Sequence, residues 1–374
     1  MQASSLTAFC RQTHTNRIYA ALVRQNGAFM EKAYLVLSDG TVFEGVPFGA
    51  RVGASGELVF TTGVVGYLET LTDAAYAGQI VVQTFPLIGN YGVITEDLQG
   101  SVHPAGYVVR EICDAPNNFR CEGTLDAYLK REGVPGICGV DTRALTRHLR
   151  EHGTMNAVIT DAIPADPVKI GACTVPAMSA SARTETEVFG TGKHRVTLID
   201  YGCGAQLIPA LTARGCTVTA VPYNTSAETI LAAKPDGVVL SGGAGDPAEN
   251  AAAIAEIAVL AGKVPLFGVG LGHQMLAIAL GAKTEKLPHG HRGGQPVRDL
   301  AGSRSYTTSQ NHGYTVVSES VKNGVVRYVN VNDRSCEGID YPDKKAFSVQ
   351  FDPASSQDMG LLFDRFICMM GGED

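Results

Sequence analysis

The stretch that most constrains the fold of this chain is 264–281, VPLFGVGLGHQMLAIALG. Its apolar run at 264–269 predicts a buried strand, a glycine-rich corner follows, and 271–280 predicts an amphipathic helix. A sharp strand-to-helix corner of this kind is the frame of a nucleophile elbow, in which the corner residue stands above a sheet and the next backbone N–H faces a developing oxyanion. Here the corner residue is Gly270. The frame of a nucleophilic site is therefore present without a nucleophilic side chain.

Length and composition indicate two compact domains of the α/β class. The 374 residues exceed one ordinary domain, and 43 glycines with 45% hydrophobic residues are typical of folded α/β proteins. A net charge of −7 without any basic block argues against nucleic acid as a partner. No apolar run reaches the ~18–20 residues of a membrane span. Nine cysteines without CxxC pairing indicate no disulfide framework and no metal site, so we expect a reducing, cytoplasmic setting.

The first 29 residues differ in composition from the rest of the chain. They contain three arginines and no acidic residue, which weakly resembles an organelle-targeting peptide. Met30 immediately precedes the first strand signal, so we interpret 1–29 as a flexible arm or as the product of an upstream start codon.

Residues 30–160 predict a β-rich domain. Apolar runs separated by turn signals, such as the Ser-Asp-Gly turn at 38–40, favour strands and hairpins from AYLVL to GELVFTTGVVGYLETLTD and on to GYVVREI. Helical spacing appears at 124–132. A second helix is predicted after Asp141, which can cap it, with an apolar face made by Ala144, Leu145 and Leu149.

Residues 161–193 are rich in Ala, Pro, Thr and Ser and predict an interdomain segment. In 194–374, buried-type strands such as RVTLIDYG and DGVVLSGGAGDP alternate with helical stretches. This alternation predicts a doubly wound, mostly parallel sheet. Ligands of such sheets bind beyond the carboxyl ends of the strands, where the elbow and the SGGAGDP loop are both expected.

The carboxyl-terminal motifs resemble those of the class I, triad-type glutamine amidotransferases. GVGLGHQ at 268–274 matches the G-x-C-x-G-H-Q signature except at its cysteine, where Gly270 stands. FSVQFDPAS at 347–355 resembles F-x-V-Q-x-H-P-E-A, with Asp352 at the position of the histidine base and Ala354 at that of the orienting glutamate. All three triad positions are altered, and removal of the nucleophile alone costs on the order of 10⁶ in turnover. We therefore expect no glutaminase activity.

The resemblance also implies which residues hold glutamine and its oxyanion. Two of the substitutions weaken this site, because Ala75 stands for a serine that contacts glutamine and Ala244 for the usual proline. His312 is interpreted as structural rather than as a replacement base. Cys203 and Cys336 are interpreted as buried or incidental thiols, since neither lies at an elbow. The implied substrate-binding positions are Ala75, Gly243, Gly245, Leu271, Gln274, Asn311, Gly313 and Tyr314.

The amino-terminal block resembles the carbamoyl phosphate synthetase small subunit, a domain that other triad amidotransferases lack. The motifs that carry this resemblance are ELVFTTGVVGYLETLTD at 57–73, YAGQIV at 76–81, FPLIGNYG at 85–92 and GVDTRALTRHLREHG at 139–153. In that family the small subunit hydrolyses glutamine and passes ammonia to a large subunit. The large subunit makes carbamoyl phosphate from bicarbonate, ammonia and two ATP for pyrimidine and arginine synthesis.

The resemblance implies no cofactor in this chain, which has no P-loop, and ATP and Mg²⁺ are expected on the large subunit. Three functions stay open. The first is a heterodimer subunit that keeps a large subunit competent for free ammonia. The second is a stand-alone glutamine-binding or regulatory pseudoenzyme, with weak glutamine binding. The third is a hydrolase in which Asp352 activates water. Because the triad, Ala75, Ala244 and the shortened GHRGGQPV loop all differ from the family, we attribute the changes to divergence.

Overall fold

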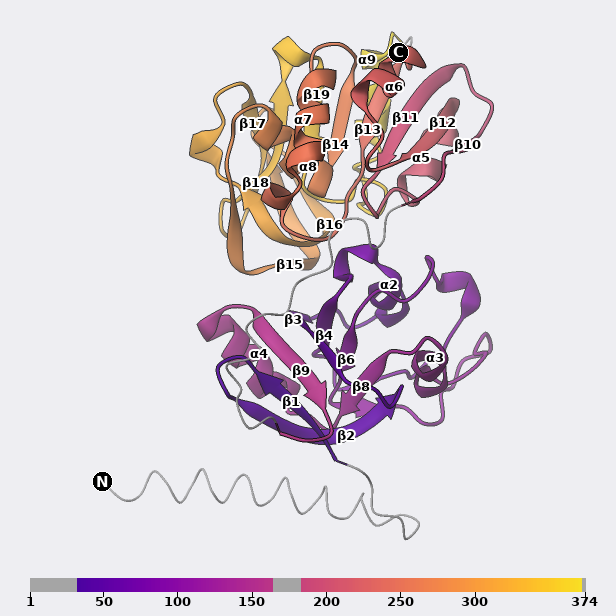
Figure 1. The fold of residues 1–374 in the computed structure, drawn as a ribbon, viewed down its shortest axis with the longest axis vertical. Helices are drawn as coiled ribbons and strands as arrows, with labels where there is room; N and C mark the ends of the chain where they lie inside the picture. Colours follow the sequence, from indigo (N-terminus) through magenta and orange to yellow (C-terminus); the bar gives the residue numbers. More distant parts are fainter. Residues whose placement is uncertain (1–31, 164–182, 372–374) are drawn as a thin grey trace, which may run out of the picture.

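The structure is a computed structural model that describes residues 32–163 and 183–371. The predicted arm at 1–29 lies outside these residues. Two domains follow one another along the chain, the first coloured indigo to magenta and the second red to yellow in Figure 1. Within the described residues, no helix is long and apolar enough to cross a membrane.

The amino-terminal domain is a closed barrel of seven strands in the order β1-β2-β8-β6-β4-β3-β9. Its strands are β1 (Ala33–Leu37), β2 (Val42–Gly49), β3 (Ala54–Thr61), β4 (Gln79–Gln83), β6 (Gly106–Val108), β8 (Pro135–Cys138) and β9 (Met155–Thr160). The short strands β5 (Leu87–Ile88) and β7 (Glu111–Ile112) pair beside it. Its helices are α2 (Tyr67–Thr72), η1 (Ala74–Tyr76), η2 (Thr95–Asp97), α3 (Leu125–Arg131) and α4 (Thr142–His152). The predicted β-rich domain is confirmed.

Local chemistry explains most of these boundaries. The β1–β2 hairpin turns at Gly40, whose φ of 88° suits glycine. The side chain of Asp141 caps α4 by accepting the N–H of Ala144 at 3.0 Å. Two expectations are corrected here. Ala144 is exposed, so the buried face of α4 consists of Thr142, Leu145 and Leu149. The stretch YLETLT, expected in a strand-rich segment, forms α2 instead.

The carboxyl-terminal domain is built on a ten-stranded sheet in the order β10-β12-β11-β13-β14-β19-β18-β16-β15-β17. Five neighbouring strands, β12, β11, β13, β14 and β19, run parallel to one another. The remaining strands of the sheet pair with their neighbours in antiparallel fashion. The strands are β10 (Glu187–Phe189), β11 (His194–Asp200), β12 (Cys216–Pro222), β13 (Gly237–Leu240), β14 (Leu266–Val269), β15 (Thr284–Asp299), β16 (Ser305–Val316), β17 (Val325–Asn330), β18 (Cys336–Tyr341) and β19 (Ala346–Val349). The helices are α5 (Leu207–Thr212), α6 (Ala227–Ala232), η5 (Pro247–Glu249), α7 (Ala251–Leu260), α8 (Leu271–Ala279), η6 (Ser318–Ser320), η7 (Pro342–Lys344) and α9 (Leu361–Met369).

Helices cover both faces of the parallel strands, as the doubly wound pattern predicts. One buried cluster joins the sheet to α6, α7 and α8, and the other joins it to α5 and α9. Phe267 of β14 stacks on Phe347 of β19, with ring centroids 4.5 Å apart, and meets Phe363 of α9 edge-on. Each fully buried phenylalanine contributes roughly 1.5–3 kcal/mol. The strand that ends at the elbow is therefore held rigidly at the centre of the domain.

The predicted interdomain segment 161–193 is shorter than expected at its carboxyl end. Residues Glu187–Phe189 form β10, which pairs with β12 and so belongs to the sheet. Of the remaining segment, 164–182 lies outside the described residues.

The two domains meet where β15 and β16 face the barrel. Asn311 Nδ2 donates to Asp73 Oδ2 at 2.7 Å, and the backbone N–H of Thr154 donates to Pro288 O at 2.8 Å. An ion pair of 2.5 Å joins Lys286 to Glu57. These contacts hold the barrel against β15 and β16, which belong to the same sheet as the strand that leads into the elbow.

Candidate functional site

A cavity of about 590 Å³ lies between the two domains and is called the interdomain cavity below. The carboxyl ends of β11, β13, β14 and β19 supply one wall, and β3, α2 and η1 of the barrel supply the other. Its position agrees with the rule that ligands bind beyond the carboxyl ends of parallel strands. All predicted site positions line this cavity except Leu271 and Ala354.

Gly270 occupies the strand-to-helix corner between β14 and α8. Its backbone has φ 55° and ψ −114°, and its N–H donates to Val349 O at 2.9 Å. A Cβ at this position would lie 3.3 Å from Gly242 Cα and 3.9 Å from Gln350 O. The strained corner of an elbow is thus present, and a side chain here would face two residues of the cavity wall.

The glycines beside the corner are required by close packing. A Cβ at Gly272 would come within 2.4 Å of Leu240 O, and one at Gly243 within 2.2 Å of Tyr201 O. Gly245 has a φ of 99°, which also favours glycine. These clashes explain why α8 and the loop after β13 can approach the sheet so closely.

Replacing Gly270 by alanine is expected to destabilise the protein by roughly 1–3 kcal/mol, because a Cβ-bearing residue stores strain at this φ and ψ. Urea unfolding of the Gly270→Ala variant measures the effect. Gly123→Ala is the matched control, since a Cβ there meets no atom within 4 Å and its φ is not positive. Equal stability of Gly270→Ala and the unchanged protein would show that the corner is unstrained.

Gln274, in the first turn of α8, links two other residues of the cavity wall through hydrogen bonds. Gln274 Nε2 donates to Tyr314 O and to Gln350 Oε1, both at 2.8 Å. The Leu271 side chain is buried and packs toward Gly243 rather than into the cavity. His273 is fully buried, its Nδ1 lies 2.7 Å from Ser348 Oγ, and burial lowers its pKa to about 3. This histidine is therefore a neutral core residue.

The two remaining triad positions lie beyond the end of β19. Asp352 lines the cavity, and its Oδ1 accepts the N–H of Ala354 at 2.9 Å. Ala354 is exposed and lies outside the cavity wall, whereas the neighbouring Ser355 lines it. No nucleophile–base pair is formed by the residues at 270, 352 and 354, because they are a glycine, a carboxylate and an alanine.

Asn311, Gly313 and Tyr314 line the cavity from β16 of the same sheet. Asn311 is held by its bond to Asp73, and Asp73 Oδ1 also accepts the N–H of Ala75 at 2.9 Å. Burial raises the pKa of Asp73. Ala75 lines the cavity, so position 75 offers no side-chain hydroxyl to a ligand.

Sequence reasoning did not assign Cys203 to the site, yet Cys203 lines the interdomain cavity. Burial raises the pKa of its thiol well above the usual value, and the nearby carboxylates of Asp73, Asp200 and Asp352 raise it further. A thiol that stays protonated is a poor nucleophile. Cys336 is fully buried and lies outside the cavity wall, as expected.

His312 also lines the cavity, but both of its ring nitrogens already face oxygen atoms. Nδ1 lies 2.8 Å from Tyr314 O and Nε2 lies 3.0 Å from Gln310 Oε1. Burial lowers its pKa well below the usual value. This placement supports a structural histidine rather than a replacement base.

Arg292 is a second residue that sequence reasoning missed. Its guanidinium is buried in the cavity wall, where Nη1 donates to the backbone oxygens of His291 and His312. The only sequence signal was its place in the altered GHRGGQPV segment, which was expected to be a loop but forms part of β15. Two cations, Arg292 and Lys286, share the wall with the carboxylates of Glu57, Glu69, Asp73, Asp246, Glu249 and Asp352. The cavity is therefore lined by an excess of acidic groups.

Comparison with known proteins places both domains in characterised families. The carbamoyl-phosphate synthase small chain, CPSase domain, matches residues 35–159, and the glutamine amidotransferase class-I domain matches residues 197–369. A carbamoyl phosphate synthase small chain from Bacillus cereus is 45% identical over 353 residues, covering 91% of this chain and 96% of the relative. The corresponding small chain from Lactococcus lactis is 43% identical over 354 residues, covering 91% and 99%.

A third relative is named a carbamoyl phosphate synthase pyrimidine-specific small chain, from Halalkalibacterium halodurans. It is 46% identical over 357 residues, and the match covers 91% of this chain and 97% of the relative. These matches bear out the resemblance found in the motifs of both domains. Because such relatives match along nine-tenths of the sequence, the chain belongs to the carbamoyl phosphate synthase small chain family.

Proposed function

We propose that this chain is a carbamoyl phosphate synthase small subunit that has lost glutamine hydrolysis and supports synthesis from free ammonia. The observation that carries the proposal is Gly270 at an otherwise intact elbow, with Asp352 in the same cavity. Hydrolysis of an amide by this family's chemistry needs a nucleophile and a base beside it. The cavity wall offers a glycine and a carboxylate at these two positions.

A large subunit is the proposed partner. Family membership supports this partner, because the relatives are named as small chains of a synthase. The barrel domain, which matches the small-chain family model over residues 35–159, retains the family's own fold while the altered triad positions all lie in the second domain. The proposed setting is the cytoplasm, and the proposed pathways are pyrimidine and arginine synthesis, with ATP and Mg²⁺ bound by the partner.

Size-exclusion chromatography of the chain mixed with a carbamoyl phosphate synthase large subunit tests the partnership. We expect co-elution at micromolar concentrations, with each protein run alone as the control. Separate elution would instead favour a stand-alone glutamine-binding or regulatory protein, for which the surviving Gln274, Asn311 and Tyr314 wall is the supporting feature.

Glutamine is expected to bind weakly. The Ala75 methyl group leaves one polar group of the ligand without its hydroxyl partner, which costs about 1–3 kcal/mol. Titration calorimetry should give a dissociation constant above the micromolar range, and Ala75→Ser should tighten binding about tenfold, or ~1.4 kcal/mol. Ala252→Ser on the exposed face of α7 is the matched control. Submicromolar binding to the unchanged chain would contradict this expectation.

A further inference from the structure

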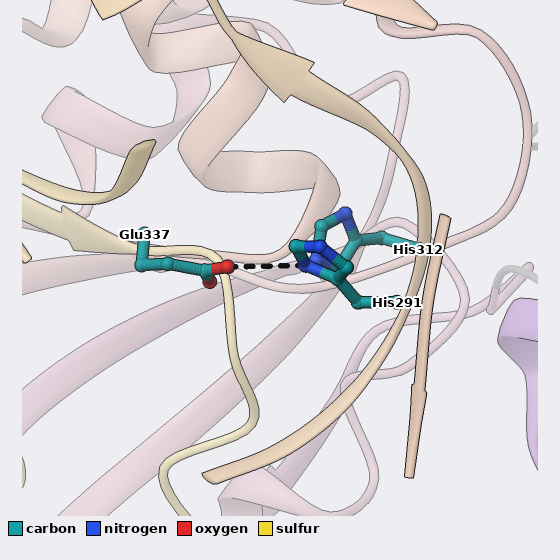
Figure 2. Close-up of side chains that lie close together, drawn as sticks. All are labelled: His291, His312 and Glu337. Atoms are coloured by element: carbon teal, nitrogen blue, oxygen red, sulfur yellow. Dashed lines mark hydrogen bonds and ion pairs between the residues drawn. The ribbon is translucent and has the colours of Figure 1, made fainter. Parts of the chain in front are cut away.

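A compact group of metal-ligand side chains extends inward from the cavity wall, which only His312 among them lines, and has no part in the proposed function. His291 on β15, His312 on β16 and Glu337 on β18 come from three strands, and their ligand atoms all lie within 4.8 Å of one another. Figure 2 shows the Glu337 carboxylate directed at the His291 ring, with the His312 ring beside it. Glu337 is fully buried, and the two histidines are 8% and 9% exposed.

The hydrogen bonds around the two rings contain more acceptors than neutral imidazoles can satisfy. His291 Nδ1 lies 3.2 Å from Glu337 Oε1, and its Nε2 lies 2.9 Å from Asp333 Oδ2. Both His291 Nδ1 and His312 Nε2 lie 3.0 Å from Gln310 Oε1, while His312 Nδ1 faces Tyr314 O. All four ring nitrogens therefore face oxygen atoms. A neutral imidazole has only one N–H to donate.

Protonating both rings is unfavourable in this arrangement. Their centroids are 4.8 Å apart, and the interplanar angle is 82°. His312 touches only neutral carbonyl oxygens, and the guanidinium of Arg292 donates to its backbone oxygen. Two buried cations this close would repel strongly, and only His291 has carboxylates at its nitrogens. The surroundings of the two rings therefore differ, with carboxylates at the nitrogens of His291 and carbonyl oxygens at those of His312.

We infer that His291 Nδ1, His312 Nε2 and a Glu337 carboxylate oxygen form a binding site for a divalent transition metal ion, for which Zn²⁺ is the best match. Two imidazoles and a carboxylate are a ligand set that Zn²⁺ uses. Ligands ~2.1 Å from a tetrahedral ion lie about 3.4 Å apart, so the observed 3.2 Å between His291 and Glu337 fits, and small side-chain rotations bring in the third ligand. Gln310 Oε1 or water completes the shell.

The outer contacts match those of metal-bound histidines. Such histidines donate their other N–H to a carboxylate or a backbone carbonyl, which fixes the tautomer. Here His291 Nε2 faces the Asp333 carboxylate and His312 Nδ1 faces the Tyr314 carbonyl. The second Glu337 oxygen accepts Gln310 Nε2 at 2.9 Å. With an ion in place, both rings are neutral and every ring nitrogen has a partner. The ion would join β15, β16 and β18 behind the wall that carries Gln310 and His312.

The test uses the untagged full-length chain, stripped with a chelator, loaded with Zn²⁺ and passed through gel filtration. We expect elemental analysis to find about one equivalent of retained zinc and the thermal midpoint to rise on loading. Loading with Co²⁺ should give the intense visible absorption of a tetrahedral ion, a readout that needs no variant. No retained zinc, or only the weak spectrum of octahedral Co²⁺, would overturn the inference and leave a metal-free hydrogen-bond network.

Variants assign the ligands. His291→Gln and Glu337→Gln should abolish retention, and Asp333→Ala should weaken zinc affinity about 10- to 100-fold. His148→Gln is the matched control, because His148 forms a comparable pair with Asp39 at 2.6 Å on the amino-terminal domain. Circular dichroism checks that each variant is folded. Equal zinc retention by His291→Gln, Glu337→Gln and the control would also overturn the assignment.

Discussion

The variant Gly270→Cys/Asp352→His/Ala354→Glu is expected to release glutamate from glutamine at least 100-fold faster than Gly270→Cys alone. A thiol without a basic partner keeps a pKa near ~8.5 and stays mostly protonated at neutral pH. A carboxylate at position 352 is too weak a base, and its negative charge raises the thiol pKa further. A histidine there can take and return a proton, a contribution of about 10²–10⁴ in rate.

Cys203 already shows what an introduced thiol would experience in this cavity. Burial raises its pKa, and among the carboxylates that raise it further are Asp73 and Asp352. Removing Asp352 in the repaired variant takes one of these charges away. The gain from Ala354→Glu should be the smaller part, because position 354 is exposed and outside the cavity wall.

Glutamate release and labelling by a glutamine-analogue alkylator measure the repair, with mass spectrometry to locate the label. Cys203→Ser in the repaired background is the control, because it removes the other thiol of the cavity wall without touching position 270. If Gly270→Cys alone equals the repaired variant, another residue serves as the base. His312 would then be the first residue to replace.

Much of this site could be predicted from the sequence, because short motifs fix local backbone geometry. The elbow was predicted from the apolar run at 264–269 and the glycine-rich corner after it, and the structure adds that a Cβ at Gly272 would clash with Leu240 O. The start of α4 was predicted from capping by Asp141, and α3 was predicted from the helical spacing at 124–132, where the structure shows Thr124 as its cap. By contrast, α2 begins at Tyr67, and its N-cap residue Gly66 offers no side-chain cap, so no local signal marked its start.

The contacts that the sequence could not predict join residues far apart in the chain. The bond between Asp73 and Asn311 spans 238 positions and depends on how the two domains dock. Cys203 and Arg292 enter the cavity wall for the same reason, since their roles depend on which strands meet there. The cluster of His291, His312 and Glu337 needs three strands in register. Cysteine spacing alone indicated no metal site.

The second large effect concerns the source of nitrogen for the assembled synthase. With a large subunit, bicarbonate and ATP, the chain is expected to support carbamoyl phosphate synthesis from ammonium and not from glutamine. The reason is the loss of the nucleophile at position 270 and of the base at position 352. Loss of a triad nucleophile alone costs on the order of 10⁶ in turnover, and loss of its base adds little. We expect docking to depend on the barrel domain, which matches the small-chain family over residues 35–159, rather than on the triad positions.

The most direct measurement compares carbamoyl phosphate formation by the reconstituted pair from ammonium and from glutamine, with glutamate release followed in the same reaction. A carbamoyl phosphate synthase with established glutamine-dependent activity, assayed with both of its subunits, is the positive control for glutamine use. Our account predicts ammonium-supported synthesis and a glutamine-supported rate below about one thousandth of it, with no glutamate above background. Glutamine-supported turnover near the ~10 s⁻¹ of ordinary enzymes would contradict the loss of the amidotransferase reaction.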